Sequence, residues 1–311
     1  MSFAGKVKEE LYRQTGRSRH CQIAELTALF TCCGQVLIEN GVNYTIKFLT
    51  ENLTVLKKSY ILFKKAFRIA PDLSVRGSHQ YLLYLLDDEE AQNCLEAMHI
   101  LDDDGGLVSE GLLEKMCCKR AFLRGIFMAC GSVTDPNSGY HLEMTLGSSR
   151  YAEQIREIIG VCGMEAKIVE RKKMYVVYMK EGSAISDFLS LIGAPVSMME
   201  FENVRILKDM RNSINRKVNC ETANIKKTVS AATRQTNDIQ YIHDTIGFGN
   251  LSDNLAQIAK LRLDNPDVTL KELGEMLEPP LGKSGVNHRL RRLSEIAENL
   301  RGKNQIGGNY D

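Results

Sequence analysis

A segment near the C-terminus carries side chains whose types and spacing suit the reading of DNA bases. From Ser284 onward, apolar residues recur at alternating intervals of four and three positions, as in an amphipathic helix. These residues are Val286, Leu290, Leu293, Ala297 and Leu300. The opposite face presents His288 and Arg291, with Asn287 beside them. Arginine pairs bidentately with guanine and asparagine with adenine, so this face suits the major groove of DNA.

A second helix is predicted immediately before this segment. Thr269 and Glu272 have the spacing of a capping box, which marks a helix start. Pro279-Pro280 ends that helix, because proline removes a backbone donor and clashes with the preceding turn. Residues 268–301 are therefore predicted to form a helix-turn-helix. The connection from Leu277 to Ser284 is longer than in compact repressor-type motifs, and it is similar to that of sigma-factor region-4 modules.

The side chains expected to contact DNA fall into base readers and phosphate contacts. Outward groups near the start of the last helix are expected to meet base edges, while Lys283 and Arg292 are expected to meet phosphates. The predicted set is Thr269, Lys271, Lys283, Ser284, Asn287, His288, Arg289, Arg291 and Arg292. Additional contacts are predicted for Arg211, Arg216, Lys217, Lys226 and Lys227.

The charge distribution also favours a phosphate-rich partner for the C-terminal third. Residues 1–202 carry 23 Lys and Arg against 26 Asp and Glu, while residues 203–303 carry 17 against 12. A basic segment attached to a near-neutral body suits nucleic acid. Within this predicted basic domain we expect helices over Val204–Val218 and Asn219–Arg234, and a third helix capped by Ser252. Residues 304–311 are predicted to be a flexible tail.

Cysteine chemistry is the second possibility that the sequence raises. The chain has nine cysteines, including the adjacent pairs Cys32-Cys33 and Cys117-Cys118, and no CxxC. This pattern lacks the spacing of a metal site, so the thiols are interpreted as small buried apolar groups, and neither a metal nor another cofactor is expected. The start, MSFAGKVKEELYRQ, lacks the apolar core of a secretory signal, which favours the reducing cytoplasm. No apolar run approaches the roughly 18 residues of a membrane span.

The first two hundred residues contain two copies of one pattern. Ala24–Val36 and Ala121–Val133 each read as an apolar helix that ends at Cys-Gly. Each copy continues to give the order αββαββα, with the two leading helices expected to pack against each other. We expect repeats at about 20–101 and 117–200 within a domain spanning 1–202. The predicted fold class is α+β, followed by an all-α DNA-binding domain.

The expected elements of the two copies correspond in order. In the first copy they are strand Tyr44–Leu49, helix Thr54–Phe67, strands Leu73–Val75 and Tyr81–Leu86, and a helix opened by Asp87–Glu90. In the second they are strand His141–Leu146, helix Ser149–Cys162, strands Ala166–Glu170 and Met174–Met179, and a helix opened by Ser183–Ser186. A turn is expected at Asn40-Gly41, and Asp102–Gly106 is expected to form the loop between the two repeats.

This duplication resembles the LAGLIDADG homing-endonuclease fold. In that fold, paired motif helices form a pseudo-twofold axis, and each helix contributes an acid to a divalent-metal site. The motif falls on Leu26–Gly34 and Leu123–Gly131, which places Cys33 and Cys130 at the acid positions. A neutral, soft thiol does not replace the hard carboxylate oxygens that hold Mg²⁺. We therefore expect no catalytic residue and no enzyme activity, with residual site-specific endonuclease activity as the alternative.

The pairing of a degenerate LAGLIDADG duplication with a C-terminal helix-turn-helix resembles the WhiA family. The local sequences that carry this resemblance are Asn215-Arg216, Asn219–Glu221 and Lys283–Arg289. The family consists of bacterial transcription regulators linked to sporulation septation, cell division and chromosome segregation. The resemblance implies a cytoplasmic, nucleoid-associated regulator that binds double-stranded DNA, is monomeric in isolation and meets a regulatory protein partner through its LAGLIDADG-like domain. RNA binding by the basic third is less favoured, since no aromatic stacking platform is visible there.

Overall fold

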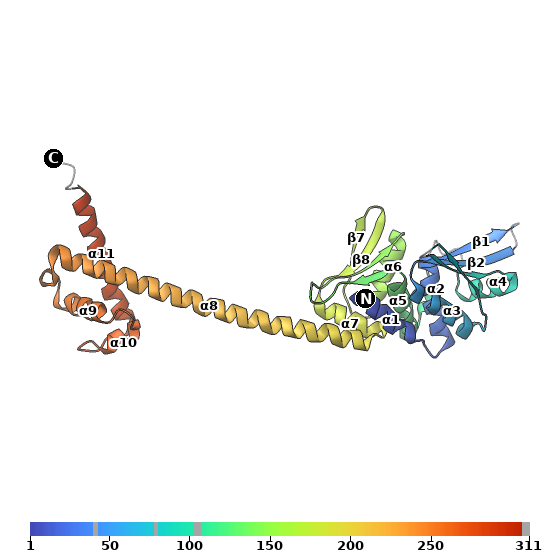
Figure 1. Ribbon diagram of the computed structural model, residues 1–311, viewed down its shortest axis with the longest axis horizontal. Helices are drawn as coiled ribbons and strands as arrows, with labels where there is room; N and C mark the ends of the chain where they lie inside the picture. Colours follow the sequence, from blue (N-terminus) through green and yellow to red (C-terminus); the bar gives the residue numbers. More distant parts are fainter. Residues whose placement is uncertain (40–42, 78–79, 102–106, 307–311) are drawn as a thin grey trace. The chain divides into compact units, whose positions relative to one another are not determined.

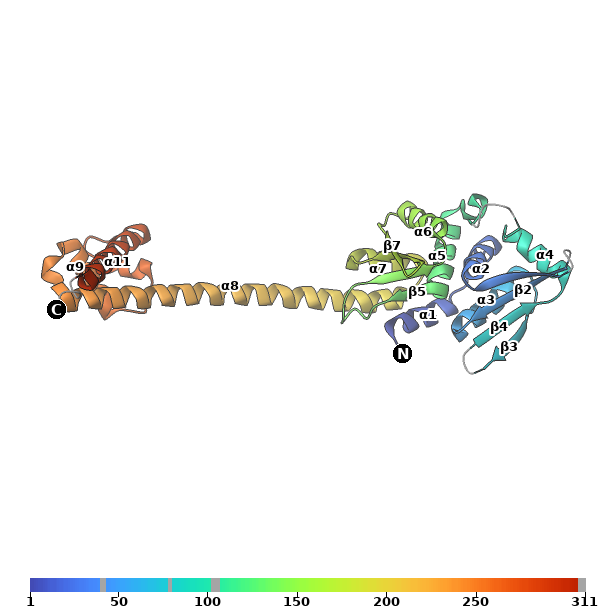
Figure 2. The same ribbon diagram turned by 90° about the horizontal axis from the view of Figure 1, so that it is seen from above.

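The chain folds into two compact units, Met1–Asp209 and Met210–Asp311. The structure, a computed structural model, describes residues 1–39, 43–77, 80–101 and 107–306 (Figures 1 and 2). The sequence-based domain boundary was placed at residue 202, whereas the units divide after Asp209, within helix α8 (Pro195–Ile246). None of the described helices is both long and apolar enough to cross a membrane.

The first unit contains the two predicted αββαββα copies, which confirms the fold class. The first copy consists of α2 (Arg19–Cys33), β1 (Gly34–Glu39), β2 (Asn43–Thr50), α3 (Leu53–Ala66), β3 (Asp72–Arg76), β4 (Gln80–Leu85) and α4 (Asp88–Ala97). The second consists of α5 (Met116–Cys130), β5 (Gly131–Val133), β6 (Leu142–Leu146), α6 (Ser149–Val161), β7 (Lys167–Arg171), β8 (Met174–Met179) and α7 (Gly182–Ile192), preceded by the 3₁₀ helix η1 (Glu110–Leu113). The antiparallel sheets have matching orders, β1-β2-β4-β3 and β5-β6-β8-β7.

One helix of the first unit was not expected from the sequence, and two expected connections are not described by the structure. Helix α1 (Phe3–Arg13) was not predicted, although it buries Phe3, Val7 and Leu11 at a spacing of four residues against the same core. The turn expected at Asn40-Gly41 and the loop expected at Asp102–Gly106 lie outside the described residues. The apolar core of the first unit therefore includes α1, a helix that is not part of either repeat.

The two leading helices pack closely, as expected from their apolar character. Gly125 of α5 makes this approach possible, because a Cβ atom there would lie 2.6 Å from the Glu25 carbonyl oxygen and 2.7 Å from the Cβ of Ala28. At this crossing the fully buried Glu25 carboxylate binds two cations. Its Oε1 lies 2.9 Å from Lys58 Nζ, and its Oε2 lies 2.8 Å from Arg124 Nη2.

Helix α8 corrects the prediction of two separate helices over Val204–Val218 and Asn219–Arg234. One continuous helix runs from Pro195 to Ile246 (Figure 1). After Pro195 its sequence contains neither glycine nor proline, so no residue interrupts the backbone hydrogen bonds. The helix ends at Gly247, whose φ of +73° is a conformation that glycine adopts readily.

In the described part of the second unit, the end of α8 packs against four further helical elements. These are η2 (Phe248–Asn250), α9 (Asp253–Asp264), α10 (Leu270–Glu275) and α11 (Lys283–Ile306). The predicted apolar stripe of the last helix is confirmed: Val286, Leu290, Leu293 and Ala297 are buried, and Leu300 is half-buried. Helix α11 extends to Ile306, into the predicted tail of residues 304–311, and residues 307–311 lie outside the described part of the chain.

Candidate nucleic-acid interface

A cationic cavity lies beside the predicted reading helix, within the second unit. The cavity measures about 380 Å³ and is walled by α8, by the segment from α9 to α10, and by the start of α11. Its lining residues are Lys227, Thr228, Ala231, Gln235, Arg262, Val268, Thr269, Leu270, Lys271, Lys283 and Asn287. Four of these are cations, and none of the described residues that line it is an acid. The cavity therefore suits an anion such as a phosphate group.

The predicted capping box, at the N-terminus of α10, forms one part of the cavity wall. The Thr269 backbone N–H donates to Glu272 Oε2 at 2.8 Å, and the Glu272 N–H donates to Thr269 Oγ1 at 3.3 Å. Both bonds of the motif are thus present, which confirms the predicted start of α10. Because the box fixes the first turn of α10, Lys271 is held at the edge of the cavity.

Gly274 brings the start of α11 back against α10. The Leu281 N–H donates to the Gly274 carbonyl at 2.9 Å, and a Cβ at position 274 would lie only 2.0 Å from the Leu281 carbonyl oxygen. No side chain fits there without moving the backbone. This close approach folds the long connection after Leu277 and places Lys283 and Asn287 on the same cavity as Lys271.

Arg262 is a functional candidate that sequence reasoning missed. Its side chain is 2% exposed, and its Nη1 donates to the Val268 carbonyl at 2.7 Å. Burial lowers the pKa of the Arg262 guanidinium, with Asp267 acting in the opposite direction. Arg262 thus braces the connection between α9 and α10 and adds positive charge to the cavity wall. The sequence spacing could have revealed this burial. Arg262 continues the series Leu255, Ile258 and Ala259, which places an arginine on the buried face of α9.

The predicted base readers lie on the exposed side of α11. Ser284, Asn287 and His288 are exposed, while Arg289 is half-buried. Arg291 and Arg292 have side chains that are 80% and 63% exposed, and both pair with Glu295, at 3.7 Å and 2.9 Å. Exposed ion pairs of this kind contribute little and exchange readily. Both arginines are therefore available to a ligand, in competition with Glu295.

The predicted additional contacts on α8 divide into two groups. Lys227 lines the cationic cavity, whereas Arg211, Arg216, Lys217 and Lys226 are exposed along α8 without lining it. Arg216 donates from Nε to the Asn212 carbonyl at 3.3 Å. The structure thus brings Lys227 together with Thr269, Lys271, Lys283 and Asn287, which are distant from it in the sequence.

The degenerate motif positions lie at the C-terminal ends of α2 and α5. Cys32 Sγ lies 3.9 Å from Cys130 Sγ, and the Cys130 thiol donates to the Ile126 carbonyl at 3.3 Å. Burial raises the pKa of Cys33 to about 11, so this thiol is neutral at physiological pH. Burial lowers the pKa of the neighbouring Lys8, and Cys32, Cys33 and Cys130 act in the opposite direction. Thiols beside a lysine side chain do not supply the carboxylate oxygens that Mg²⁺ requires.

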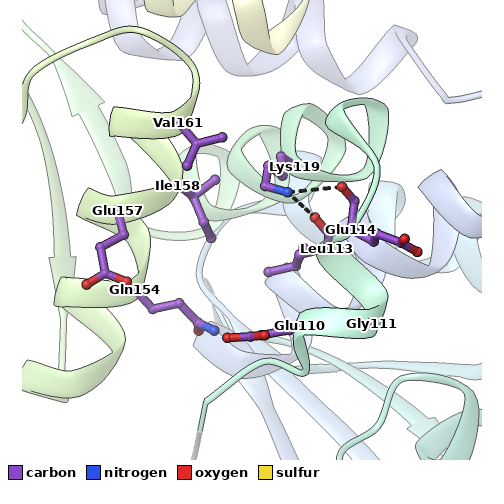
Figure 3. Close-up of a pocket in the computed structure, with 9 residues that line it drawn as sticks. All are labelled: Glu110, Gly111, Leu113, Glu114, Lys119, Gln154, Glu157, Ile158 and Val161. Atoms are coloured by element: carbon purple, nitrogen blue, oxygen red, sulfur yellow. Dashed lines mark hydrogen bonds between the residues drawn. The ribbon is translucent and has the colours of Figure 1, made fainter.

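A further cavity in the first unit is unsuited to phosphate. It measures about 540 Å³ and lies between η1, α5 and α6 (Figure 3). Among the described residues that line it are three glutamates, Glu110, Glu114 and Glu157, and one cation, Lys119. The Lys119 ammonium is engaged by the carbonyls of Leu113 and Glu114. Excess negative charge disfavours nucleic acid here.

The fold and the site define the class of the chain as a LAGLIDADG-like duplication joined to a helix-turn-helix domain. The WhiA N-terminal LAGLIDADG-like domain matches residues 19–100, the WhiA LAGLIDADG-like domain residues 119–211, and the WhiA C-terminal HTH domain residues 214–297. The chain belongs to the WhiA family.

Relatives and a solved structure agree with this membership over nearly the full length. The probable cell division protein WhiA of Lachnoclostridium phytofermentans is 48% identical, with 97% of this chain and 100% of the relative covered. That of Alkaliphilus oremlandii is 45% identical, with 96% and 98% covered. The crystal structure of full-length DUF199/WhiA from Thermatoga maritima matches with a TM-score of 0.57 and 25% identity, covering 96% of this chain and 99% of that one.

Proposed function

We propose that the second unit binds double-stranded DNA sequence-specifically and that the protein is a non-catalytic transcription regulator of cell division. The observation that carries this proposal is the cavity lined by Lys227, Lys271 and Lys283, beside Asn287 of α11. A phosphate seated there fixes the position of α11 on the duplex, and the exposed face of α11 then meets base edges. The names of the relatives support a role in cell division. We extend this role to chromosome segregation and sporulation, and we place the protein on the nucleoid in the cytoplasm.

The first unit is proposed to meet a regulatory protein partner, with the protein itself monomeric in isolation. Its first sheet exposes apolar side chains, including Ile38, Leu73 and Val75, which are 54%, 53% and 62% exposed. These side chains lie on β1 and β3, the two edge strands of the sheet, and exposed edge strands are available for pairing with a partner chain. The acidic character of the cavity in this unit supports a partner other than DNA.

Asn287→Ala and Arg291→Ala are each expected to weaken binding to the specific site by about 1–3 kcal/mol and to leave binding to random duplexes nearly unchanged. Both side chains are exposed on α11, so folding is not affected. The measurement is fluorescence anisotropy on a duplex selected from a random pool and on its scrambled version. Lys260→Ala, an exposed cation on α9 outside the cavity, is the control. Equal losses on both duplexes would show that α11 positions the protein without reading bases.

The protein is expected to leave DNA uncut in the presence of Mg²⁺ or Mn²⁺. The reason is that thiols occupy the motif positions and Lys8 interacts with them. The measurement is the conversion of supercoiled plasmid carrying the bound sequence into nicked or linear form. Nicking that survives Cys33→Ala and Cys130→Ala would reveal an active site elsewhere in the chain. Nicking that these substitutions abolish would show that thiols support the hydrolysis.

A further inference from the structure

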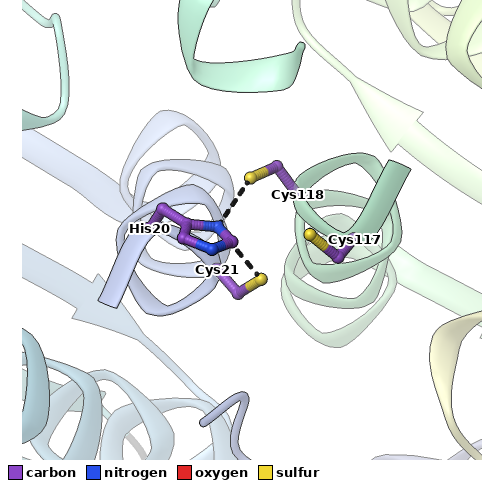
Figure 4. A group of neighbouring side chains, drawn as sticks. All are labelled: His20, Cys21, Cys117 and Cys118. Atoms are coloured by element: carbon purple, nitrogen blue, oxygen red, sulfur yellow. Dashed lines mark hydrogen bonds between the residues drawn. The ribbon is translucent and has the colours of Figure 1, made fainter. Parts of the chain in front are cut away.

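Four side chains with metal-binding chemistry converge between the two leading helices of the first unit. His20 and Cys21 come from α2, and Cys117 and Cys118 come from α5 (Figure 4). Their ligand atoms all lie within 4.8 Å of one another. His20 Nδ1 lies 3.2 Å from Cys118 Sγ and 3.4 Å from Cys21 Sγ. The spacing of the cysteines along the chain gave no sign of this convergence.

The internal duplication explains why these four residues meet. Helix α2 begins at Arg19 and α5 begins at Met116, so each pair occupies the second and third residues of its leading helix. His20 thus corresponds to Cys117, and Cys21 corresponds to Cys118. One turn further along, the buried Ala24 and Ala121 pack with Cys21 and Cys118 in a small apolar cluster. Each repeat therefore contributes two adjacent ligands, and the packing of α2 against α5 brings all four together.

The distances in the cluster suit a tetrahedral zinc ion. With Zn–S near 2.3 Å and Zn–N near 2.0–2.1 Å, tetrahedral ligands lie roughly 3.5–3.8 Å apart. The observed separations of 3.2 Å and 3.4 Å between His20 Nδ1 and two sulfur atoms are close to this value. Three thiols and one imidazole form a soft donor set that selects Zn²⁺ over Mg²⁺ or Ca²⁺.

The cluster lies at the N-terminal ends of two helices and is open to solvent on one side. The positive ends of two helix dipoles meet at the cluster and favour thiolates there. Cys21 and Cys118 are buried, His20 is half-buried and Cys117 is exposed, so an ion can enter from solvent beside Cys117.

We propose that His20, Cys21, Cys117 and Cys118 bind one Zn²⁺ ion that joins the two repeats of the first unit. All four ligands come from the protein, which is the arrangement of a structural site without an open catalytic position. The site lies at the N-terminal ends of α2 and α5, whereas the degenerate motif cysteines lie at their C-terminal ends. It is therefore separate from the ancestral metal position.

The experiment titrates Co²⁺ into the full-length, reduced, metal-free protein. One equivalent is expected to bind, with thiolate-to-cobalt charge-transfer absorption and the visible bands of tetrahedral cobalt, and Zn²⁺ is expected to displace it. Cys118→Ser and Cys21→Ser should abolish this spectrum. Cys33→Ser, a half-buried thiol at the other end of α2, and Cys220→Ser, an exposed thiol of α8, should keep it.

A second set of measurements distinguishes the loss of a metal ligand from a failure of the variant to fold. His20→Gln changes a half-buried ligand at the edge of the cluster and is expected to retain the circular dichroism of the parent while weakening Co²⁺ binding at least tenfold. Zn²⁺ should raise the melting temperature of the parent and leave that of Cys118→Ser unchanged. The proposal is overturned by three results: no charge-transfer absorption in the parent, full binding by both Cys118→Ser and His20→Gln, or a Cys21–Cys118 disulfide in protein isolated without oxygen.

Discussion

Replacing Lys227, Lys271 and Lys283 together by glutamine is expected to weaken duplex DNA binding by roughly a hundredfold at near-physiological salt. Each lysine that neutralises a phosphate releases close to one counterion, so the slope of log K against log salt should become shallower by nearly three. All three side chains are exposed and line one cavity, which makes the loss an effect on binding and not on folding. Anisotropy titrations over a range of salt concentrations measure both quantities.

The matched control removes the same charge from the other unit. Lys167, Lys172 and Lys173 are exposed at β7 and the turn after it, and their joint replacement by glutamine should change the salt slope by less than one. If this control loses as much affinity as the cavity variant, the first unit holds DNA and the cavity assignment is wrong. If both variants bind like the parent, phosphate contacts lie elsewhere on the chain.

The helix-turn-helix part of this site could be predicted from the sequence because its signals are local. The spacing of Thr269 and Glu272 and the stripe through Val286 and Leu290 depend on neighbouring residues alone. The convergence of Lys227 with Lys283 was not accessible, since it depends on how α8 packs against α11. Arg234 and Arg301 strengthen that packing: Arg234 pairs with Glu298 at 2.9 Å, and Arg301 pairs with the buried Asp238 at 2.8 Å.

The two elements misjudged from the sequence have different physical causes. The sequence pattern predicts two helices that meet near Asn219, whereas α8 is continuous because it contains no glycine or proline after its first residue. Helix α1 carries a regular period in Phe3, Val7 and Leu11 that was sufficient to predict it.

The His20 cluster was missed for a further reason. The spacing of ligands along one segment does not reveal it, because the two ligand pairs come from the two copies of the repeat. Aligning the copies places His20-Cys21 opposite Cys117-Cys118. The packing of α2 against α5 then brings the pairs together, which no local pattern records.

Glu25→Gln is expected to lower the free energy of unfolding of the first unit by about 3–5 kcal/mol. The Glu25 carboxylate and the Lys58 ammonium are both fully buried, and the Arg124 side chain is 12% exposed. The amide keeps the shape of the side chain but removes the charge, so two cations remain in a low-dielectric interior without a counterion. Denaturant unfolding of the full-length protein followed by hydrogen exchange in α2 and α5 measures the loss in this unit alone.

Two companion variants separate the buried charge from a general effect of substitution. Glu153→Gln breaks the exposed pair with Arg156 at 2.7 Å and should cost less than about 1 kcal/mol. Glu25→Gln combined with Lys58→Met should recover part of the loss, because it also removes the cation that has become unpaired. A loss at Glu25 no greater than that at Glu153 would mean that water or movement of Lys58 compensates the charge. The crossing of α2 and α5 would then depend on the close contact at Gly125, and not on the ion pairs.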